Sequence, residues 1–167
     1  MKYKEFDIQS IFNILPGKRL TKSNMVQGKR PFIGATDSFL NNGITEWVDN
    51  YNESLDKNCL GVNYNGSVGE TFYHPYSCIF SDDVKRLHLK SSSASHYTML
   101  FLKTAILQQK EKYAYGYKFN EKRMLKQIIT LPATPDGSPD WDYMESYMRH
   151  HEAQHILSAI QHFQSRS

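Results

Sequence analysis

The sequence predicts an α/β (α+β) domain that is rich in short strands and ends in one long helix. Short apolar runs between residues 59 and 89 are separated by Asn-Gly, Pro and Ser-Asp-Asp, which is typical of strands joined by tight turns. Residues 94–109 and 141–163 instead carry apolar side chains at helical spacing. A chain of 167 residues has the length of a single domain with a core of ordinary size.

The composition is typical of a soluble globular protein, because 40% of the residues are hydrophobic and 22% are charged. The first residues lack the apolar core of a signal peptide, and no apolar run reaches the length of a membrane span. We therefore expect a cytoplasmic protein without membrane contact. The cysteines, Cys59 and Cys78, have neither zinc-site spacing nor a disulfide framework, which predicts buried thiols in a reducing compartment.

The first half of the chain begins with an apolar element, strand or helix, over residues 6–14, which ends at Pro16-Gly17. Residues 31–36 are expected to be extended, and Asn41-Asn42-Gly43 predicts a tight turn because Asn and Gly tolerate positive φ. In the β-rich part, residues 59–64 and 67–73 are expected to pair across an Asn65-Gly66 hairpin turn.

Two more strands are expected after this hairpin, at residues 77–80 and 84–89. The three serines at 91–93 are predicted to cap the helix of residues 94–109.

Residues 113–147 form the most informative stretch. An aromatic and basic loop at 113–118 leads into a short helix at 120–127 and then an apolar strand at 128–131. The strand is expected to stop at Pro132, because proline cannot donate to a ladder. A Pro-Asp-Gly-Ser-Pro turn follows, and Asp140 is the predicted N-cap of the final helix.

Four short motifs in this stretch are Tyr-Gly-Tyr-Lys-Phe (115–119), Ile-Thr-Leu-Pro (129–132), Asp-Gly-Ser-Pro-Asp-Trp (136–141) and Tyr-Met-Glu-Ser-Tyr (143–147). Their order resembles the end of a target recognition domain from the DNA specificity (S) subunits of type I restriction–modification systems. Less specific matches are the apolar run before Gly17-Lys18, Asn-Asn-Gly-Ile at 41–44 and Gly-Ser-Val-Gly at 66–69. The position after Gly116 is often Arg in the family and is Tyr117 here.

The resemblance implies a sequence-specific DNA-binding subunit that directs a methyltransferase, and with it a nuclease, to a DNA site. It implies a β-rich target recognition domain over residues 1–140 and a C-terminal helix over 141–167 for dimerisation or methyltransferase docking. The expected partners are double-stranded DNA, a modification subunit and a restriction subunit, with no catalysis and no cofactor of its own. Complete S subunits carry two such domains, so the chain is either a half-size subunit that pairs with a copy of itself or a fragment of a larger protein.

The charges are unevenly distributed along the chain. Five basic residues and no acid lie between Asp7 and Asp37, and seven basic residues against two acids lie from Lys103 to Lys126. We expect these two segments to form one DNA-binding surface, the alternative being a scatter of solvated lysines. The predicted DNA contacts are Lys18, Arg19, Lys22, Lys29, Arg30, Asn41, Asn42, Asn65, Ser67, Tyr117, Lys118, Lys122 and Arg123.

The final helix has two apolar stripes. Trp141, Met144 and Met148 lie on one face of its first half, whereas Ile156, Ile160 and Phe163 lie on a different face of its second half. The change of face predicts packing on the helix's own domain first and a partner-chain interface at Ile156, Ile160 and Phe163 afterwards. The alternative is a helix packed wholly on its own domain.

One motif suggests a different function. His151-Glu152-x-x-His155 has the pattern with which zinc hydrolases bind metal and activate water. His162 lies on the same helix and is poorly placed as a third ligand. A zinc-dependent hydrolase is therefore the alternative to the non-catalytic specificity subunit, and a protein-binding scaffold is a third candidate.

Overall fold

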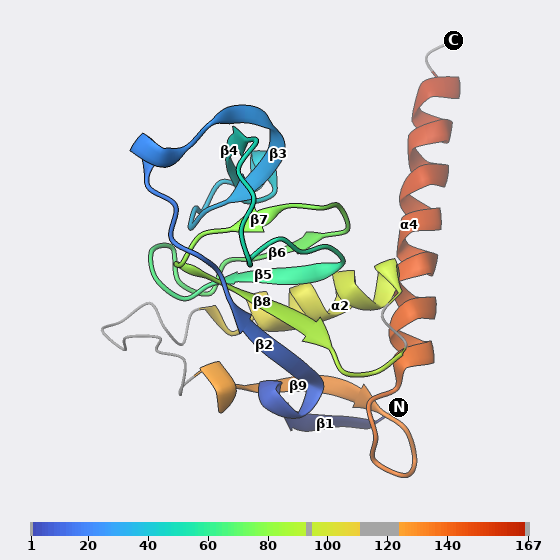
Figure 1. Ribbon diagram of the computed structural model, residues 1–167. Coiled ribbons are helices and arrows are strands. Elements are labelled where there is room, and N and C mark those ends of the chain that lie inside the picture. Colours follow the sequence, from blue (N-terminus) through green and yellow to red (C-terminus); the bar gives the residue numbers. More distant parts are fainter. Residues whose placement is uncertain (1, 93–94, 111–123, 166–167) are drawn as a thin grey trace.

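The protein, seen here in a computed structural model that describes residues 2–92, 95–110 and 124–165, stacks three small sheets beside one long helix (Figure 1). A pair of strands, β1 and β9, lies at one end, the sheet β2-β8-β5-β6 at the centre, and the sheet β4-β3-β7 at the other end. The elements are β1 (Lys2–Asp7), α1 (Ile8–Ile11), β2 (Phe12–Pro16), η1 (Lys22–Asn24), β3 (Gln27–Ile33), η2 (Phe39–Asn41), β4 (Ile44–Val48), β5 (Cys59–Asn63), β6 (Thr71–His74), β7 (Ile79–Phe80), β8 (Val84–Leu89), α2 (His96–Leu107), β9 (Ile128–Ala133) and α4 (Trp141–Gln164).

The fold is α+β with mixed sheets, as predicted from the sequence. All pairings within the central sheet are antiparallel, whereas β7 pairs with β3 in parallel. Helix α2 packs against β5, β6, β9 and α4, so that it lies between the central sheet and the long helix. The main core is formed by apolar side chains from these elements and from α1, including Ile8, Leu60, Leu87, Met99, Leu102, Ile129 and Met144.

The predicted hairpin joins β5 to β6, with Val62 opposite Thr71. Gly66 and Ser67 adopt the left-handed φ values of 64° and 44° that the turn requires. The second strand begins at Thr71 rather than at residue 67, because the backbone of residues 67–70 is used to close the turn: Glu70 N–H donates to the Ser67 carbonyl.

The N-terminal apolar element is in fact three elements. Phe6 belongs to β1 and Phe12 to β2, while Ile8 and Ile11 lie in the one-turn helix α1, which buries both side chains. The Ile8 N–H donates to the Gln127 carbonyl at 2.8 Å, which fixes this turn beside β9.

Two local predictions were wrong. Strand β9 continues through Pro132 to Ala133, because among the described strands it pairs only with β1, so a residue without an N–H is tolerated in it. Helix α2 is capped by Ser95, whose side chain accepts from the Thr98 N–H, and not by the serines at 91–93.

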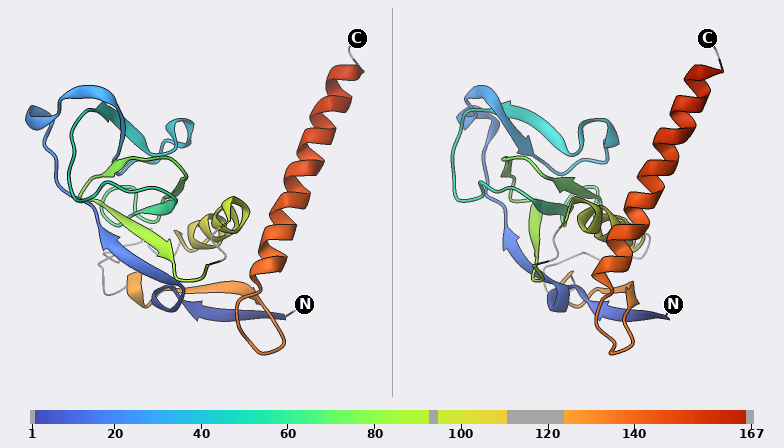
Figure 2. Two further views of the ribbon diagram at one scale, coloured as in Figure 1. Left: turned by 45° about the vertical axis from the view of Figure 1, so that its right-hand side comes forward. Right: turned by 90° about the vertical axis from the view of Figure 1, so that its right-hand side faces the viewer.

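Helix α4 has two halves with different environments. Asp140 caps it, as predicted, by accepting from the Tyr143 N–H at 3.0 Å, and Met144 is fully buried in the core. From Glu152 to Ser165 every residue is exposed, and the helix projects away from the body (Figure 2). In the part of the chain that the structure describes, no helix combines the length and apolar character needed to span a membrane.

Both cysteines are buried and free, as expected. Desolvation raises the pKa of the Cys59 thiol strongly and that of Cys78 to about 12. Both thiols are therefore protonated and unreactive at neutral pH.

A buried network around Arg86 connects the central sheet to the outer sheet. The Arg86 guanidinium donates to the Pro16 carbonyl at 2.7 Å and to Asp56 Oδ2 at 2.8 Å. His88 Nε2 lies 2.7 Å from the same carboxylate oxygen, and the backbones of Asp56 and Cys78 exchange hydrogen bonds just before β7. Because the Arg86 and Asp56 side chains are only 8% and 15% exposed, this ion pair is largely desolvated.

Replacing Arg86 with methionine is expected to lower the free energy of unfolding by about 3 kcal/mol, because Asp56 then stays buried without its guanidinium. Urea unfolding followed by circular dichroism measures the change. Arg149→Met is the control, since the Arg149–Glu145 pair is an exposed bridge within one helix and contributes little to stability. Equal losses in the two variants would contradict this role of Arg86.

A second buried polar group makes the stability depend on pH. His74 is fully buried, its ring packs edge-on against Phe80, and Nε2 has no hydrogen-bond partner in the described structure. Burial lowers the pKa of His74 from 6.5 to about 3. The unfolded chain therefore binds a proton below pH 6.5 that the folded chain does not bind, so stability falls as the pH decreases.

Acidification from pH ~7 to pH ~5 is expected to cost the wild-type fold about 2 kcal/mol through His74 alone. His74→Gln removes this titration, so the difference in unfolding free energy between variant and wild type should shrink by that amount over the same range. Urea unfolding at several pH values measures the difference. Parallel pH profiles for the two proteins would show that His74 is protonated in the folded state.

Candidate nucleic-acid interface

The first basic segment lies at the end of the molecule that is formed by the β4-β3-β7 sheet. It borders a hollow of about 520 Å³, which is lined by Arg19 and Lys22 together with Asn65 of the hairpin turn. Glu46, Asp82 and Asp83 line the same hollow. The fold thus brings together three of the predicted DNA-contact residues, but it places carboxylates among them.

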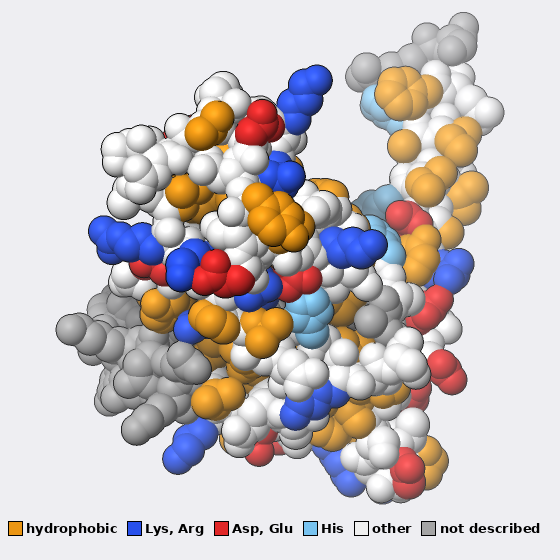
Figure 3. Space-filling model, viewed as in Figure 1, with side chains coloured by type: hydrophobic (Ala, Val, Ile, Leu, Met, Phe, Trp, Pro, Cys, Tyr) orange, Lys and Arg blue, Asp and Glu red, His pale blue; other side chains and the backbone are white. Residues whose placement is uncertain are grey.

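Much of the positive charge in this segment is paired within the protein. Lys18 Nζ lies 2.6 Å from Glu53, and Arg19 lies 3.8 Å from Asp82. The hydrogen bond between Lys18 and Glu53 raises the pKa of the lysine and lowers that of the carboxylate. Figure 3 shows Lys and Arg side chains beside Asp and Glu side chains over this end of the molecule, so its field is less positive than the sequence of the segment suggests.

Lys22 and Lys29 differ from these paired residues. Both are exposed, and neither ammonium group has an ion pair among the residues that the structure describes. They are the cations of this segment that are most available to phosphate.

Arg30 has a structural role instead. Its guanidinium donates to the carbonyls of Asp49 and Asn50, at 3.0 Å for Asp49, and lies 5.9 Å from the centre of the Tyr51 ring. These contacts hold residues 49–51 against β3, and both hydrogen bonds come from Nη1 of the guanidinium group.

The predicted asparagine and serine contacts also divide into side chains that bind other parts of the protein and residues that are exposed. Asn42 adopts a left-handed φ of 49°, and its amide donates to the Tyr73 carbonyl at 2.8 Å and to Tyr76 Oη at 2.9 Å. The Asn65 amide donates to Asp83 Oδ1 at 2.7 Å. Asn41 and Ser67 are exposed, with the carbonyl of Ser67 accepting from the amide of Asn63.

Of the second basic segment, the structure describes Lys103, Lys110 and Lys126, and the ammonium group of Lys110 pairs with the buried carboxylate of Glu70. The predicted contacts Tyr117, Lys118, Lys122 and Arg123 lie outside the described residues. The merging of the two basic segments into one surface therefore stays a prediction.

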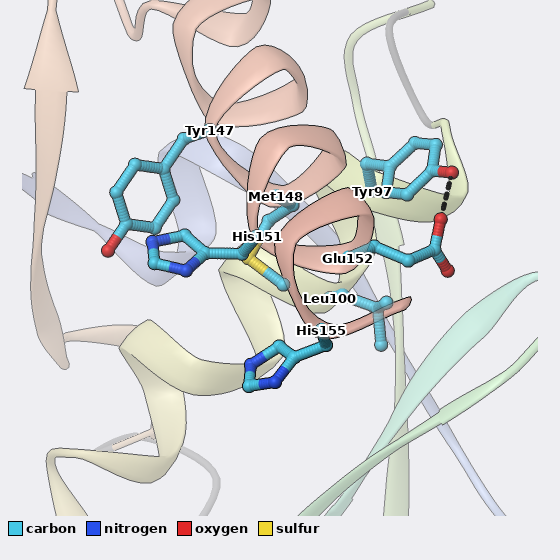
Figure 4. A pocket seen from close by; sticks show the side chains of 7 residues that line it. All are labelled: Tyr97, Leu100, Tyr147, Met148, His151, Glu152 and His155. Carbon is cyan, nitrogen blue, oxygen red and sulfur yellow. Dashed lines mark hydrogen bonds between the residues drawn. The ribbon is translucent and has the colours of Figure 1, made fainter. Parts of the chain in front are cut away.

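The His151-Glu152-x-x-His155 motif lines a hollow of about 340 Å³ between α2 and α4 (Figure 4). Glu152 accepts a hydrogen bond from Tyr97 Oη at 2.5 Å, which raises the pKa of the tyrosine. The His151 ring lies 4.4 Å from the Tyr147 ring, on the other side of the helix from the Glu152 carboxylate. The glutamate thus joins two helices and does not face a position between the two histidines.

The family of the chain follows from its sequence as a whole. The model of the Type I restriction modification DNA specificity domain matches residues 1–162. The chain belongs to this family. Among curated proteins, the specificity domain is 58% identical over 148 residues to the specificity subunit S.BcgI of the Type II restriction enzyme BgcI from Heyndrickxia coagulans. That match covers 89% of this chain and 43% of the relative, so the chain spans less than half the length of S.BcgI.

Solved structures of S subunits share the fold of the specificity domain. The S subunit of a type I system from M. genitalium aligns with a TM-score of 0.62 at 18% identity, over 78% of this chain and 34% of that chain. The HsdS subunit from Thermoanaerobacter tengcongensis aligns with a TM-score of 0.64 at 15% identity, over 97% of this chain and 40% of that chain. The predicted family and fold class are thereby confirmed.

The zinc hydrolase alternative has no support in this specificity domain. Within residues 2–92, 95–110 and 124–165, the group of three side chains with metal-ligand spacing is Asp56, Cys59 and His88, none of which comes from α4. In that group, Asp56 Oδ2 already binds Arg86 and His88, and burial keeps the Cys59 thiol protonated. The group is accounted for by the Arg86 network.

The structure also draws attention to residues that the sequence analysis of the specificity domain missed. A second hollow, of about 280 Å³, is lined by Lys22, Gln27, Glu46 and Trp47 together with Met25 and Val48. Trp47 is 48% exposed, which is unusual for so large an apolar side chain. The available signal was the polar and aromatic pair Glu46-Trp47, which follows the Asn42-Gly43 turn after two residues.

Proposed function

We propose that this chain is the DNA target recognition part of a restriction–modification specificity subunit, which directs a DNA methyltransferase and an associated nuclease to one DNA sequence. The observation that carries the proposal is the 58% identity to a protein named as a specificity subunit, over 89% of this chain. In this proposal residues 1–140 recognise duplex DNA and the helix of residues 141–167 docks a partner. The chain itself performs no catalysis, and it acts in the cytoplasm where the methyltransferase meets DNA.

The charges of the outer sheet support a DNA-binding role. Lys22 and Lys29 are exposed and unpaired in the described structure, whereas Lys18 and Arg19 have carboxylate partners. Binding of an ammonium group to phosphate releases condensed counterions, so free lysines contribute affinity that falls steeply with salt. Paired cations contribute less, because DNA must first displace their partners.

Replacing Lys22 and Lys29 together with alanine is expected to weaken binding to all duplexes alike. The slope of log affinity against log salt should decrease in magnitude by about 2, because each phosphate contact contributes about 0.9. A mobility-shift titration at several salt concentrations, with the methyltransferase subunit present, measures both effects. Lys18→Ala with Arg19→Ala is the matched control and should change the slope less. The absence of wild-type binding at low salt would overturn the DNA-binding function itself.

The exposed apolar side chains in the second half of α4 support an interface with a partner chain. Ile156, Ile160 and Phe163 are 53%, 46% and 71% exposed, and Leu157 beside them is 58% exposed. Each such side chain gains about 1.5–3 kcal/mol on burial, which together offsets a substantial part of the cost of association. We propose that this stripe packs on a second copy of the chain, or on the methyltransferase subunit when that is present. A two-fold pair would present two recognition domains to a site with two half-sites.

Replacing Ile156 and Ile160 together with aspartate is expected to abolish this assembly while the domain stays folded, because the residues make no contribution to the core. Sedimentation velocity of the chain alone and with the methyltransferase subunit measures the assembly state, and circular dichroism measures the fold. Gln154→Asp with Ser158→Asp adds the same charge to the opposite face of the helix and should leave assembly unchanged. An identical assembly state for both double variants and the wild type would refute the interface.

A further inference from the structure

The two hollows of the outer sheet lie next to each other. Lys22, Met25 and Glu46 line both the hollow beside the hairpin turn and the one beside Trp47. We call the surface made by Lys22, Gln27, Glu46 and Trp47 the β4 trough. It lies on an outer strand, because in the described part of the chain β4 pairs with β3 alone.

An irregularity in the sheet places the trough residues next to one another. Gln27 and Arg30 both lie opposite Val48, so the residues between them bulge out of the ladder. Gly28 sits in this bulge so close to Asp49 that a side chain at this position would collide with the Asp49 carboxylate and backbone. The bulge therefore fixes Gln27 beside the end of β4, where Glu46 and Trp47 lie.

The polar side-chain groups of the trough are not bound by other described parts of the protein. Among the described residues, no hydrogen bond or ion pair engages the side chains of Lys22, Gln27 or Glu46, or the indole N–H of Trp47. Other polar side chains nearby are committed: the amide of Asn42 binds Tyr73 and Tyr76, and the amide of Asn65 binds Asp83. The trough thus offers free hydrogen-bonding groups beside polar side chains that are bound within the fold.

We infer that Gln27, Glu46 and Trp47 determine which base pairs the domain recognises, by contacting base edges in the major groove of duplex DNA. This inference rests on the proposed DNA-binding function and assigns its specificity to side chains that are not basic. A glutamine amide pairs with N6 and N7 of adenine, and a carboxylate accepts from N4 of cytosine. The face of an indole gives apolar contact to the thymine methyl group.

The negative charge of Glu46 favours base contact over phosphate contact. A carboxylate is repelled by the phosphate backbone, whereas the amino groups of cytosine and adenine are donors that need an acceptor. Lys22, which borders the same trough, is placed to bind a phosphate and to keep the carboxylate in register with the bases. An alternative role for Glu46 is to protect an exposed strand edge from pairing with another chain, which requires no sequence preference.

Selection from a library of duplexes with a randomised central region tests the assignment. The full chain with its methyltransferase subunit is compared with Gln27→Ala, Glu46→Ala and Trp47→Ala variants, each checked for an unchanged melting temperature. Each variant should lose preference at its own base-pair position, by about tenfold or more, and keep the affinity for unselected duplexes. Gln27→Glu should in addition exchange a preference for adenine with one for cytosine at its position.

The controls separate this inference from the proposed function. Glu5→Ala, on an exposed strand of the two-stranded sheet, should select the wild-type sequence unchanged. A wild-type chain that selects a sequence, with all three alanine variants selecting the same one, would overturn the role of the trough while leaving DNA binding intact. Weakened binding to every duplex in the variants, without altered preference, would also overturn it, since that outcome assigns the residues to phosphate contact. A wild-type chain that binds no duplex would remove both proposals.

Discussion

The buried contact between Arg86 and Asp56 is the constraint on which the arrangement of the central and outer sheets depends. One guanidinium group satisfies the last carbonyl of β2 and the carboxylate of the segment before β5, and that segment in turn pairs with the strand entering β7. The central sheet and the outer sheet are thereby tied at one point that has little access to water. A surface that reads DNA must keep its side chains within hydrogen-bonding tolerance of the bases, and this tie provides a rigid base for it.

The sequence was sufficient for those features that depend on neighbouring residues. The β5–β6 hairpin, the two long helices and the Asp140 cap all follow from apolar spacing and turn chemistry within a few positions. The extension of β9 through Pro132 depended on a partner more than a hundred residues earlier, β1, whose charged sequence has little strand character. Local patterns do not contain that information.

The same difference between local and distant contacts explains why the sequence did not reveal the hydrogen-bond partners of the candidate site residues. Asn42 was a reasonable DNA contact in the sequence, because a turn asparagine is usually exposed, but its amide is bound by groups 31 and 34 residues away. Glu152 looked catalytic in its motif, yet its partner, Tyr97, lies 55 residues earlier on another helix. A polar side chain is available for function only when no tertiary partner binds it. Those partners lie far away in the sequence, so local sequence patterns do not identify them.

Some polar side chains of this domain are hydrogen-bonded within the fold and others are not, and this difference affects how such a domain evolves. The polar side chains of the β4 trough make no hydrogen bonds to the described part of the fold, so exchanging them costs little stability, typically within about 0.5 kcal/mol for a surface position. Arg86, Asn42 and the buried apolar residues have no such freedom. Random substitution can therefore explore new chemistries on the trough while purifying selection holds the scaffold fixed, and a lineage can acquire a different target preference without passing through an unfolded intermediate.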